Sequence, residues 1–227
     1  LLQIRLKEGH KYIGKKIRDL KLGGILAVLI EREGEAIIPR GEVTLKEGDV
    51  LFLAGSIPAS MPDDMYERIM KRLEGRGVMT VVDATKDLLV KVLKYHPFLV
   101  KPNNHELGEI FGVELKTRED VVPYGKKLQE MGAENVLISM AGEGAVLIAA
   151  NGQVYKKPVP TGTLVNGVGA GDSMVAGFMA GWMEKRDYRH AFYMGIAAGS
   201  ASAFSENLAT GKEVEAVYRQ VAGQKQE

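Results

Sequence analysis

The first part of the chain, residues 1–54, alternates short apolar runs with turn residues. Gly, Pro and Asp separate the runs, as they do between the strands of small β domains. One segment with helical spacing, residues 14–20, interrupts them. The apolar runs are residues 1–6, 24–30, 35–39 and 49–55. This pattern predicts a small, mostly β module with the element order β-α-β-β-β.

From about residue 49 onward, continuous apolar runs alternate with helical patterns. Met65, Ile69 and Leu73 recur at four-residue spacing, which is typical of one face of a helix. The runs with the length of buried strands are residues 78–84, 97–103 and 135–142. Strands that alternate with helices predict an α/β fold, in which helices cover both faces of a parallel sheet.

The last part of the chain predicts a hairpin followed by helices. Residues 145–157 pass through Asn151-Gly152, a favoured two-residue hairpin turn. The final sixty or so residues have helical patterns throughout. An apolar stripe at helical spacing, which predicts a core-facing side, consists of Val175, Phe178, Met179 and Trp182.

Composition and charge narrow the class of protein. The 227 residues carry a net charge of +1, which gives no general attraction to nucleic acid or to a membrane surface. There is no cysteine, so disulfides and thiolate metal sites are excluded. No apolar run reaches the roughly 18 residues of a spanning helix. We therefore expect a cytoplasmic protein without membrane insertion.

The stretch NGVGAGDSMVAGFMAGW, residues 166–182, is the strongest candidate for a functional site. Gly169 and Gly171 remove side-chain bulk just before an apolar helix, so backbone N–H groups can approach a ligand closely. The helix N-terminus adds its own unpaired N–H groups and dipole, a combination that favours an anion such as phosphate. Asp172 is an unusual neighbour for phosphate. As a simpler alternative, Asp172 caps the helix.

Two further polar loops follow predicted strands, and sites of parallel sheets collect at such strand ends. KPNNHE contains Lys101, Asn103 and Glu106, and the second loop is SMAGEGA, residues 139–145. Together with Asp172, these loops suggest phosphoryl transfer, in which Asn103 and Glu106 orient hydrated Mg²⁺ and Asp172 accepts a proton from an attacking hydroxyl. We interpret Lys101 as an electrostatic or structural helper.

Simpler interpretations remain open for the same residues. Asn103 and Glu106 fit a helix capping box, and both roles are compatible. The small residues of GIAAGSASAF, 195–204, suit close helix packing and equally a position beside a nucleotide base. The chain has no GxxxxGK[ST] sequence, and Asp172 stands where a dinucleotide-binding glycine motif requires a small residue.

Several of these motifs together resemble the pfkB (ribokinase-like) family of sugar kinases. VNGVGAGDSMVAGF resembles the second signature of that family, and KPNNHE contains its Asn-x-x-Glu motif. LAGSIPASMP, VVDAT, SMAGEGAVL and GIAAGSASAFSE bring the sequence nearest to 1-phosphofructokinases, followed by tagatose-6-phosphate kinases. The resemblance covers residues 49–227 and implies a ribokinase-like fold.

The resemblance also implies roles for individual residues. Asp172 would be the catalytic base, and Gly169, Ala170 and Gly171 would form the anion hole. ATP would be bound together with Mg²⁺, without direct protein ligands to the metal, and the acceptor would be a sugar phosphate. The residues that would line the ATP site are Ser139, Met140, Ala141, Gly142, Glu143 and Gly144, together with Gly171. Gly167 departs from the family pattern, which usually has Ser or Thr there.

The first part of the chain resembles a different family. The first signature of the sugar kinases has no match in residues 1–48, whereas EGHKYIGKKIRDL and IEREGEAIIPRGEVTLKEGDVL resemble TrkA-C (RCK carboxyl-terminal) domains. Such domains regulate potassium channels and cation antiporters, typically pair as homodimers, and in some families bind a small ligand such as cyclic di-AMP. The resemblance implies these properties for residues 1–54.

Two functions follow from the two resemblances. In the first, the chain is an ATP-dependent kinase that phosphorylates a hydroxyl of a phosphorylated ketohexose, with fructose 1-phosphate as the expected acceptor. In the second, it is a regulatory ligand-binding module of the TrkA-C type, linked to potassium or cation transport, and the kinase part is catalytically silent. The second gains weight because the sugar-binding residues of the family's first signature have no match.

Overall fold

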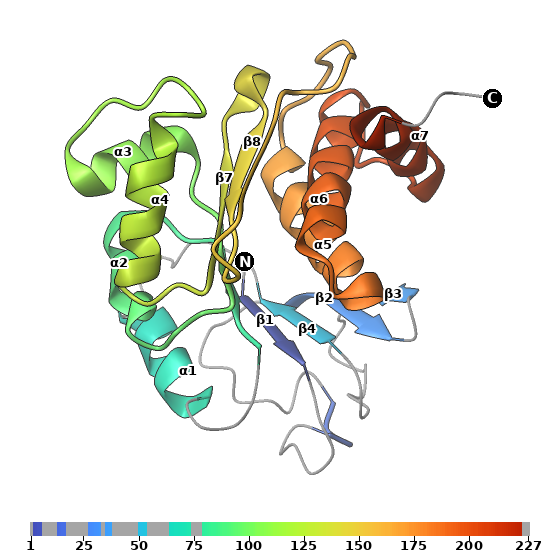
Figure 1. Cartoon of the computed structure of the whole chain (residues 1–227). Helices are drawn as coiled ribbons and strands as arrows, with labels where there is room; N and C mark the ends of the chain where they lie inside the picture. The colour runs from blue at the N-terminus through green and yellow to red at the C-terminus, as the bar shows by residue number, and fades with distance from the viewer. Residues whose placement is uncertain are drawn as a thin grey trace. The chain divides into compact units, whose positions relative to one another are not determined.

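The computed structural model describes residues 2–5, 13–16, 27–32, 35–37, 50–53, 64–73 and 79–223. The chain divides into two compact units (Figure 1). The first comprises Leu1–Val100 with Leu128–Glu134, and the second comprises Lys101–Lys127 with Asn135–Glu227. The predicted domain ranges, 1–54 and 49–227, rest on sequence resemblance and stay a prediction.

The strands predicted for the amino-terminal module are present. They are β1 (Leu2–Arg5), β2 (Ala27–Arg32), β3 (Glu35–Ile37) and β4 (Val50–Leu53). β2 pairs antiparallel with β3 and β4, and β4 pairs antiparallel with β1. The helix predicted at residues 14–20 lies largely outside the described residues.

The first strand of the module also joins the strand that begins the α/β part of the first unit. β1 pairs antiparallel with β5 (Val81–Val82) in the register Leu2↔Val82 and Gln3↔Val81. β5 in turn pairs in parallel with β6 (Leu99–Val100). The first unit therefore has the strand order β3-β2-β4-β1-β5-β6, in which β1 occupies an edge of β5 that would otherwise be unpaired.

Two helices of the first unit connect its later strands. α1 (Met65–Leu73) precedes β5, and α2 (Lys86–Leu93) links β5 to β6. α2 places Leu89, Val92 and Leu93 in the core, each at most 1% exposed. This β-α-β connection between parallel strands is the arrangement that the alternating pattern predicts.

The second unit contains the predicted hairpin with helices on both sides. β7 (Asn135–Ser139), β8 (Ala145–Ile148) and β9 (Val154–Lys157) pair antiparallel. In Figure 1, α3 (Asn104–Phe111) and α4 (Val121–Glu130) lie on one side of β7 and β8. α5 (Ala170–Lys185), α6 (Tyr188–Ala203) and α7 (Gly211–Ala222) lie on the other.

The α/β class with helices on both faces is therefore confirmed, and the strand directions are mixed. Parallel pairing joins β5 to β6, whereas β1 and the β7–β9 strands pair antiparallel. The turn of the hairpin is confirmed at Asn151-Gly152, where Gly152 has a left-handed φ of 82°. No helix in the described part of the chain is both long and apolar enough to cross a membrane.

Helices α5 and α6 pack closely because glycines lie at their contact. A Cβ on Gly195 would lie 3.0 Å from the Met174 carbonyl oxygen, and one on Gly199 would lie 3.0 Å from that of Ala170. The predicted apolar stripe lies in the core, with Val175, Phe178 and Met179 at most 1% exposed. The fourth member, Trp182, is half-buried and stacks on Tyr188 with ring centroids 4.5 Å apart.

Replacing Gly177 with alanine tests this packing. An ideal Cβ at this position lies 2.5 Å from the Met194 carbonyl oxygen and 2.6 Å from Ala198 Cβ. We expect Gly177→Ala to force α5 and α6 apart and to lower the free energy of unfolding by about 1–3 kcal/mol. Urea denaturation followed by circular dichroism measures the change.

The matched control is Gly211→Ala at the first residue of α7, where an added Cβ meets nothing within 4 Å. It should leave the free energy of unfolding unchanged or slightly raised, because alanine favours helix. Equal stability of Gly177→Ala and the unchanged protein would contradict the tight contact.

Candidate active site

A cavity of about 600 Å³ opens in the second unit, where the predicted loops meet. It lies among the start of α3, the β7–β8 loop, the start of α5 and one side of α6. The predicted site residues that line it are Asn103, Ser139, Met140, Ala141, Gly142, Glu143, Gly144, Ala170 and Gly171. The predicted residues that do not line it are Lys101, Glu106, Gly169 and Asp172.

The start of α5 has the geometry of an anion-binding helix terminus. Its N-cap is Gly169, with φ 78° and ψ −5°, a left-handed conformation that favours glycine. No side chain caps the helix, so its first N–H groups are not used by a capping side chain. Asp172 is exposed in the first turn rather than at the N-cap, so the simpler N-cap interpretation does not describe this helix.

A buried lysine lies beside the same helix terminus. Lys101 is only 6% exposed. Its Nζ atom lies 3.4 Å from the point where a Cβ on Gly171 would stand. The ammonium charge and the positive end of the helix dipole therefore act at one place, which favours a negatively charged ligand there.

Asn103 and Glu106 form the capping box of α3. The Asn103 side chain accepts a 2.8 Å hydrogen bond from the Glu106 backbone N–H, and the Glu106 carboxylate accepts one of 2.8 Å from the Asn103 backbone N–H. The capping interpretation is thus confirmed. The side-chain oxygens of Asn103 and Glu106 have further lone pairs beyond those used in these bonds. They could accept hydrogen bonds from the water molecules around a hydrated cation.

The described residues contain no cluster of three or more His, Asp or Glu side chains that could hold a metal ion directly. Mg²⁺ retains several of its waters in most protein sites. The two side chains of the capping box would hold such a hydrated ion through its waters.

The loop between β7 and β8 forms a tight turn at the cavity rim. It contains the 3₁₀ turn η2 (Ala141–Glu143), in which Ala141 has a left-handed φ of 45°. Met140 N–H donates to the Gly144 carbonyl oxygen at 2.9 Å, and Gly144 N–H donates to that of Ala141 at 3.0 Å. Gly144 has φ 88°, and an added Cβ would lie 2.1 Å from the Lys157 carbonyl oxygen.

Part of the cavity wall was not anticipated from the sequence. In the small-residue run 195–204, Gly199 packs on α5 and also lines the cavity. Close packing is thus confirmed, and the position beside a nucleotide base stays a prediction. Leu164 gave no signal beyond its apolar character and is 71% exposed. Gly167, noted for its departure from the family pattern, lines the cavity, as do Ile196, Ser200, Ala203 and Phe204 of the run 195–204. The other lining residues that were not singled out are Asn104, His105, Lys116, Val159, Pro160, Gly162 and Met174.

The fold places the chain in the ribokinase-like class. Phosphofructokinase-2 of Escherichia coli, solved with substrates and products, superposes with a TM-score of 0.68 at 25% identity, over 74% of this chain and 56% of that one. Ribokinase of Arabidopsis thaliana, solved with ribose and ATP, superposes with a TM-score of 0.62 at 20% identity, over 71% of this chain and 54% of that one.

The chain belongs to the pfkB family of carbohydrate kinases, whose family model matches residues 35–215. The TrkA-C domain model matches residues 1–60. Both resemblances drawn from the sequence are thus confirmed.

Curated relatives point to sugar-phosphate kinases within the pfkB family. The 1-phosphofructokinase of Bacillus subtilis is 49% identical over 178 residues, which cover 78% of this chain and 58% of that protein. The D-tagatose-1-phosphate kinase of Bacillus licheniformis is 36% identical over 166 residues, or 71% of this chain and 53% of that protein. The chain therefore spans little more than half the length of these relatives.

Gly144→Ala tests whether the rim loop depends on its backbone geometry. The added Cβ would meet the Lys157 carbonyl oxygen, and alanine disfavours φ 88°. We expect the free energy of unfolding to fall by about 1–3 kcal/mol, which thermal melting would detect.

Gly142→Ala is the matched control two residues away, because an added Cβ there meets nothing within 4 Å. Its melting temperature should stay close to that of the unchanged protein. A similar loss in both variants would show that the loop is sensitive to any side chain rather than to the conformation of Gly144.

Proposed function

We propose that the second unit transfers a phosphoryl group from ATP to a hydroxyl of a phosphorylated ketohexose, converting fructose 1-phosphate to fructose 1,6-bisphosphate. The observation that carries this proposal is the start of α5, where an uncapped helix terminus and the buried Lys101 ammonium adjoin the cavity. The names of the relatives, 1-phosphofructokinase and D-tagatose-1-phosphate kinase, support a ketohexose phosphate as the acceptor.

In this proposal the cavity holds the nucleotide. The rim loop from Ser139 to Gly144 and the apolar wall next to α6 enclose its base and sugar. The backbone N–H groups of Gly169, Ala170 and Gly171 and the Lys101 ammonium stabilise the negative charge that the transferring phosphoryl group carries. A hydrated Mg²⁺, held through water by Asn103 and Glu106, would add positive charge near the phosphates.

Asp172 is the proposed base. Its carboxylate is exposed in the first turn of α5 and does not line the cavity, so it can meet an acceptor that approaches from outside the nucleotide site. The acceptor hydroxyl gives its proton to this carboxylate while its oxygen bonds to the γ-phosphorus. The bond from that phosphorus to the bridging oxygen breaks, and ADP leaves.

Turnover of a sugar phosphate by this chain depends on the residues that hold the acceptor hydroxyl. Catalysis of phosphoryl transfer depends mainly on holding the reactants in position.

Asp172→Asn tests the assigned base. We expect kcat for ADP release, measured with fructose 1-phosphate, ATP and Mg²⁺, to fall at least about 100-fold, because asparagine cannot accept the proton. ATP should still raise the melting temperature of this variant, since the anion site is unchanged.

The matched control is Asp87→Asn, which alters an exposed acidic residue in the first turn of another helix, α2. It should keep the activity of the unchanged protein. Undiminished ADP release by Asp172→Asn would reject the assigned base. Absence of both turnover and ATP binding in the unchanged protein would reject the kinase function.

A second candidate function is supported by the TrkA-C match at residues 1–60. In this alternative, a homodimer of the chain binds a small regulatory ligand through this segment, and the kinase part is silent. Cyclic di-AMP should then raise the melting temperature at saturating concentration, in contrast to cyclic di-GMP as a control. An unchanged melting temperature with both nucleotides would contradict this alternative.

A further inference from the structure

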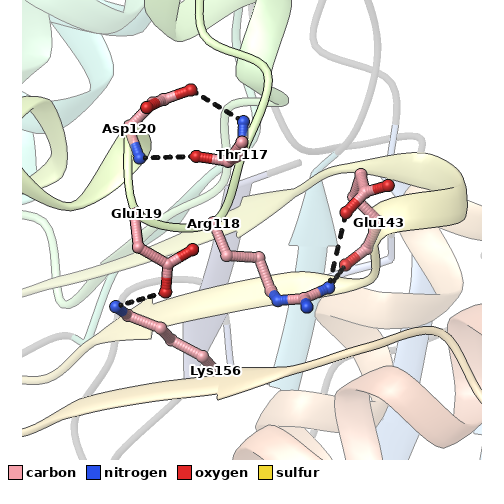
Figure 2. Close-up of polar contacts among 6 residues, drawn as sticks. All are labelled: Thr117, Arg118, Glu119, Asp120, Glu143 and Lys156. Carbon is pink, nitrogen blue, oxygen red and sulfur yellow. Dashed lines mark hydrogen bonds and ion pairs between the residues drawn. The ribbon is translucent and has the colours of Figure 1, made fainter.

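A short strap, residues Lys116–Asp120, lies against the rim turn η2 of the cavity (Figure 2). Its Arg118 side chain donates a hydrogen bond from Nη1 to the Glu143 carbonyl oxygen. The same nitrogen lies 3.6 Å from Oε2 of the Glu143 carboxylate. One guanidinium therefore holds the backbone and the side chain of the last residue of the turn.

The strap itself is fixed by its own hydrogen bonds. Asp120 Oδ2 accepts from the backbone N–H groups of Thr117 at 2.8 Å and Lys116 at 3.1 Å, and Thr117 Oγ1 accepts from Asp120 N–H at 3.2 Å. The two bonds that the carboxylate accepts lower the pKa of Asp120. This local network places Arg118 at the entrance to α4.

A second ion pair ties the strap to the hairpin. Lys156 Nζ on β9 lies 3.1 Å from Glu119 Oε1 (Figure 2). The hydrogen bond and the positive charge of Lys156 lower the pKa of Glu119. The strap thus connects β9 with the turn that follows β7.

The turn that Arg118 contacts is exposed, and three backbone hydrogen bonds close it within residues 140–144. Ala141, Gly142 and Glu143 are all exposed, and Ala141 adopts the left-handed conformation that a residue with a side chain disfavours. A single turn of 3₁₀ helix supplies few hydrogen bonds of its own. The two contacts of Arg118 with Glu143 therefore add to the few bonds that the turn makes itself.

We propose that Arg118 is a positioning residue that locks η2 in the conformation required by the nucleotide cavity. The ligand is a nucleoside triphosphate, so the proposal rests on the function proposed above. Lys116, at the other end of the strap, lines the same cavity, so the strap shapes the cavity wall in two places. If Arg118 does not hold η2, only a fraction of the molecules have the rim in the conformation that binds nucleotide. The apparent Kd for ATP is then the intrinsic Kd divided by that fraction.

The test compares Arg118→Gln, Arg118→Lys and Glu143→Gln in the full chain. Hydrogen–deuterium exchange of residues 140–144, without nucleotide, reports opening of the turn, and exchange in α7 serves as the internal reference for global unfolding. Isothermal titration with ATP and Mg²⁺ gives Kd. The matched control is Arg219→Gln, which removes an exposed arginine that pairs with Glu215 on α7.

Arg118→Gln should speed exchange at residues 140–144 and raise the Kd for ATP by about tenfold, the effect of a lost charge-assisted hydrogen bond. Arg118→Lys should lie between Arg118→Gln and the unchanged protein, because it keeps the charge but not the planar fork. Glu143→Gln should have the smaller effect, since the backbone carbonyl remains as an acceptor.

Unchanged exchange at residues 140–144 in Arg118→Gln would overturn the proposal. Faster exchange with an unchanged Kd would also overturn it, because the contact would then be structural only. Failure of the unchanged protein to bind ATP would reject the proposed function and, with it, the role of Arg118 in nucleotide binding. This outcome is recognised from the unchanged protein alone, without any variant.

Discussion

The close contact between α5 and α6 is the constraint on which the site depends. Gly199 of α6 approaches the carbonyl oxygen of Ala170, the first residue of α5. A larger residue there would move the start of α5, and with it Gly171 and the neighbouring Lys101 ammonium. The same stretch of α6 supplies Ile196 and Ser200 to the cavity wall. One packing interaction therefore sets both the anion-binding terminus and the wall next to it.

In the first unit, the main constraint is the pairing of a strand edge of the sheet. An exposed strand edge offers free N–H and C=O groups to other chains, and proteins commonly cover it. β1 pairs with β5 on one side and with β4 on the other. The strand that resembles a TrkA-C domain therefore completes the hydrogen bonding of a strand from the kinase part. This pairing uses the backbone groups of β1 and β5.

Local features of the sequence predicted much of the fold and part of the site. The four strands of the module, the Asn151-Gly152 hairpin and the capping box at Asn103 follow from short-range patterns, because each depends on residues a few positions apart. Glycine loops were found for the same reason. The assigned roles of these residues in catalysis stay predictions.

The contacts that the sequence did not reveal join segments far apart in the chain. Lys101 lies beside Gly171, seventy positions later. Arg118 contacts Glu143 from the segment Thr117–Asp120, whose Thr-x-x-Asp pattern predicts local capping bonds but not this contact. Val159, Pro160, Gly162 and Leu164 line the cavity from a segment without helix or strand periodicity. Such contacts depend on tertiary packing, which hydrophobic spacing does not encode.

In the proposed function, the N-cap of α5 lets one short segment serve both the phosphate and the acceptor. A serine or aspartate at the N-cap would bond to the first N–H groups of the helix and compete with a bound anion. Gly169 has no side chain and adopts a left-handed conformation, so no capping side chain competes for those N–H groups, of which Ala170 N–H donates to the Gly167 carbonyl oxygen at 3.3 Å. Asp172, three residues later, keeps its carboxylate exposed instead of using it as the cap. The glycine at the N-cap thus keeps the start of the helix and the Asp172 carboxylate as separate groups, as the proposed phosphoryl transfer requires.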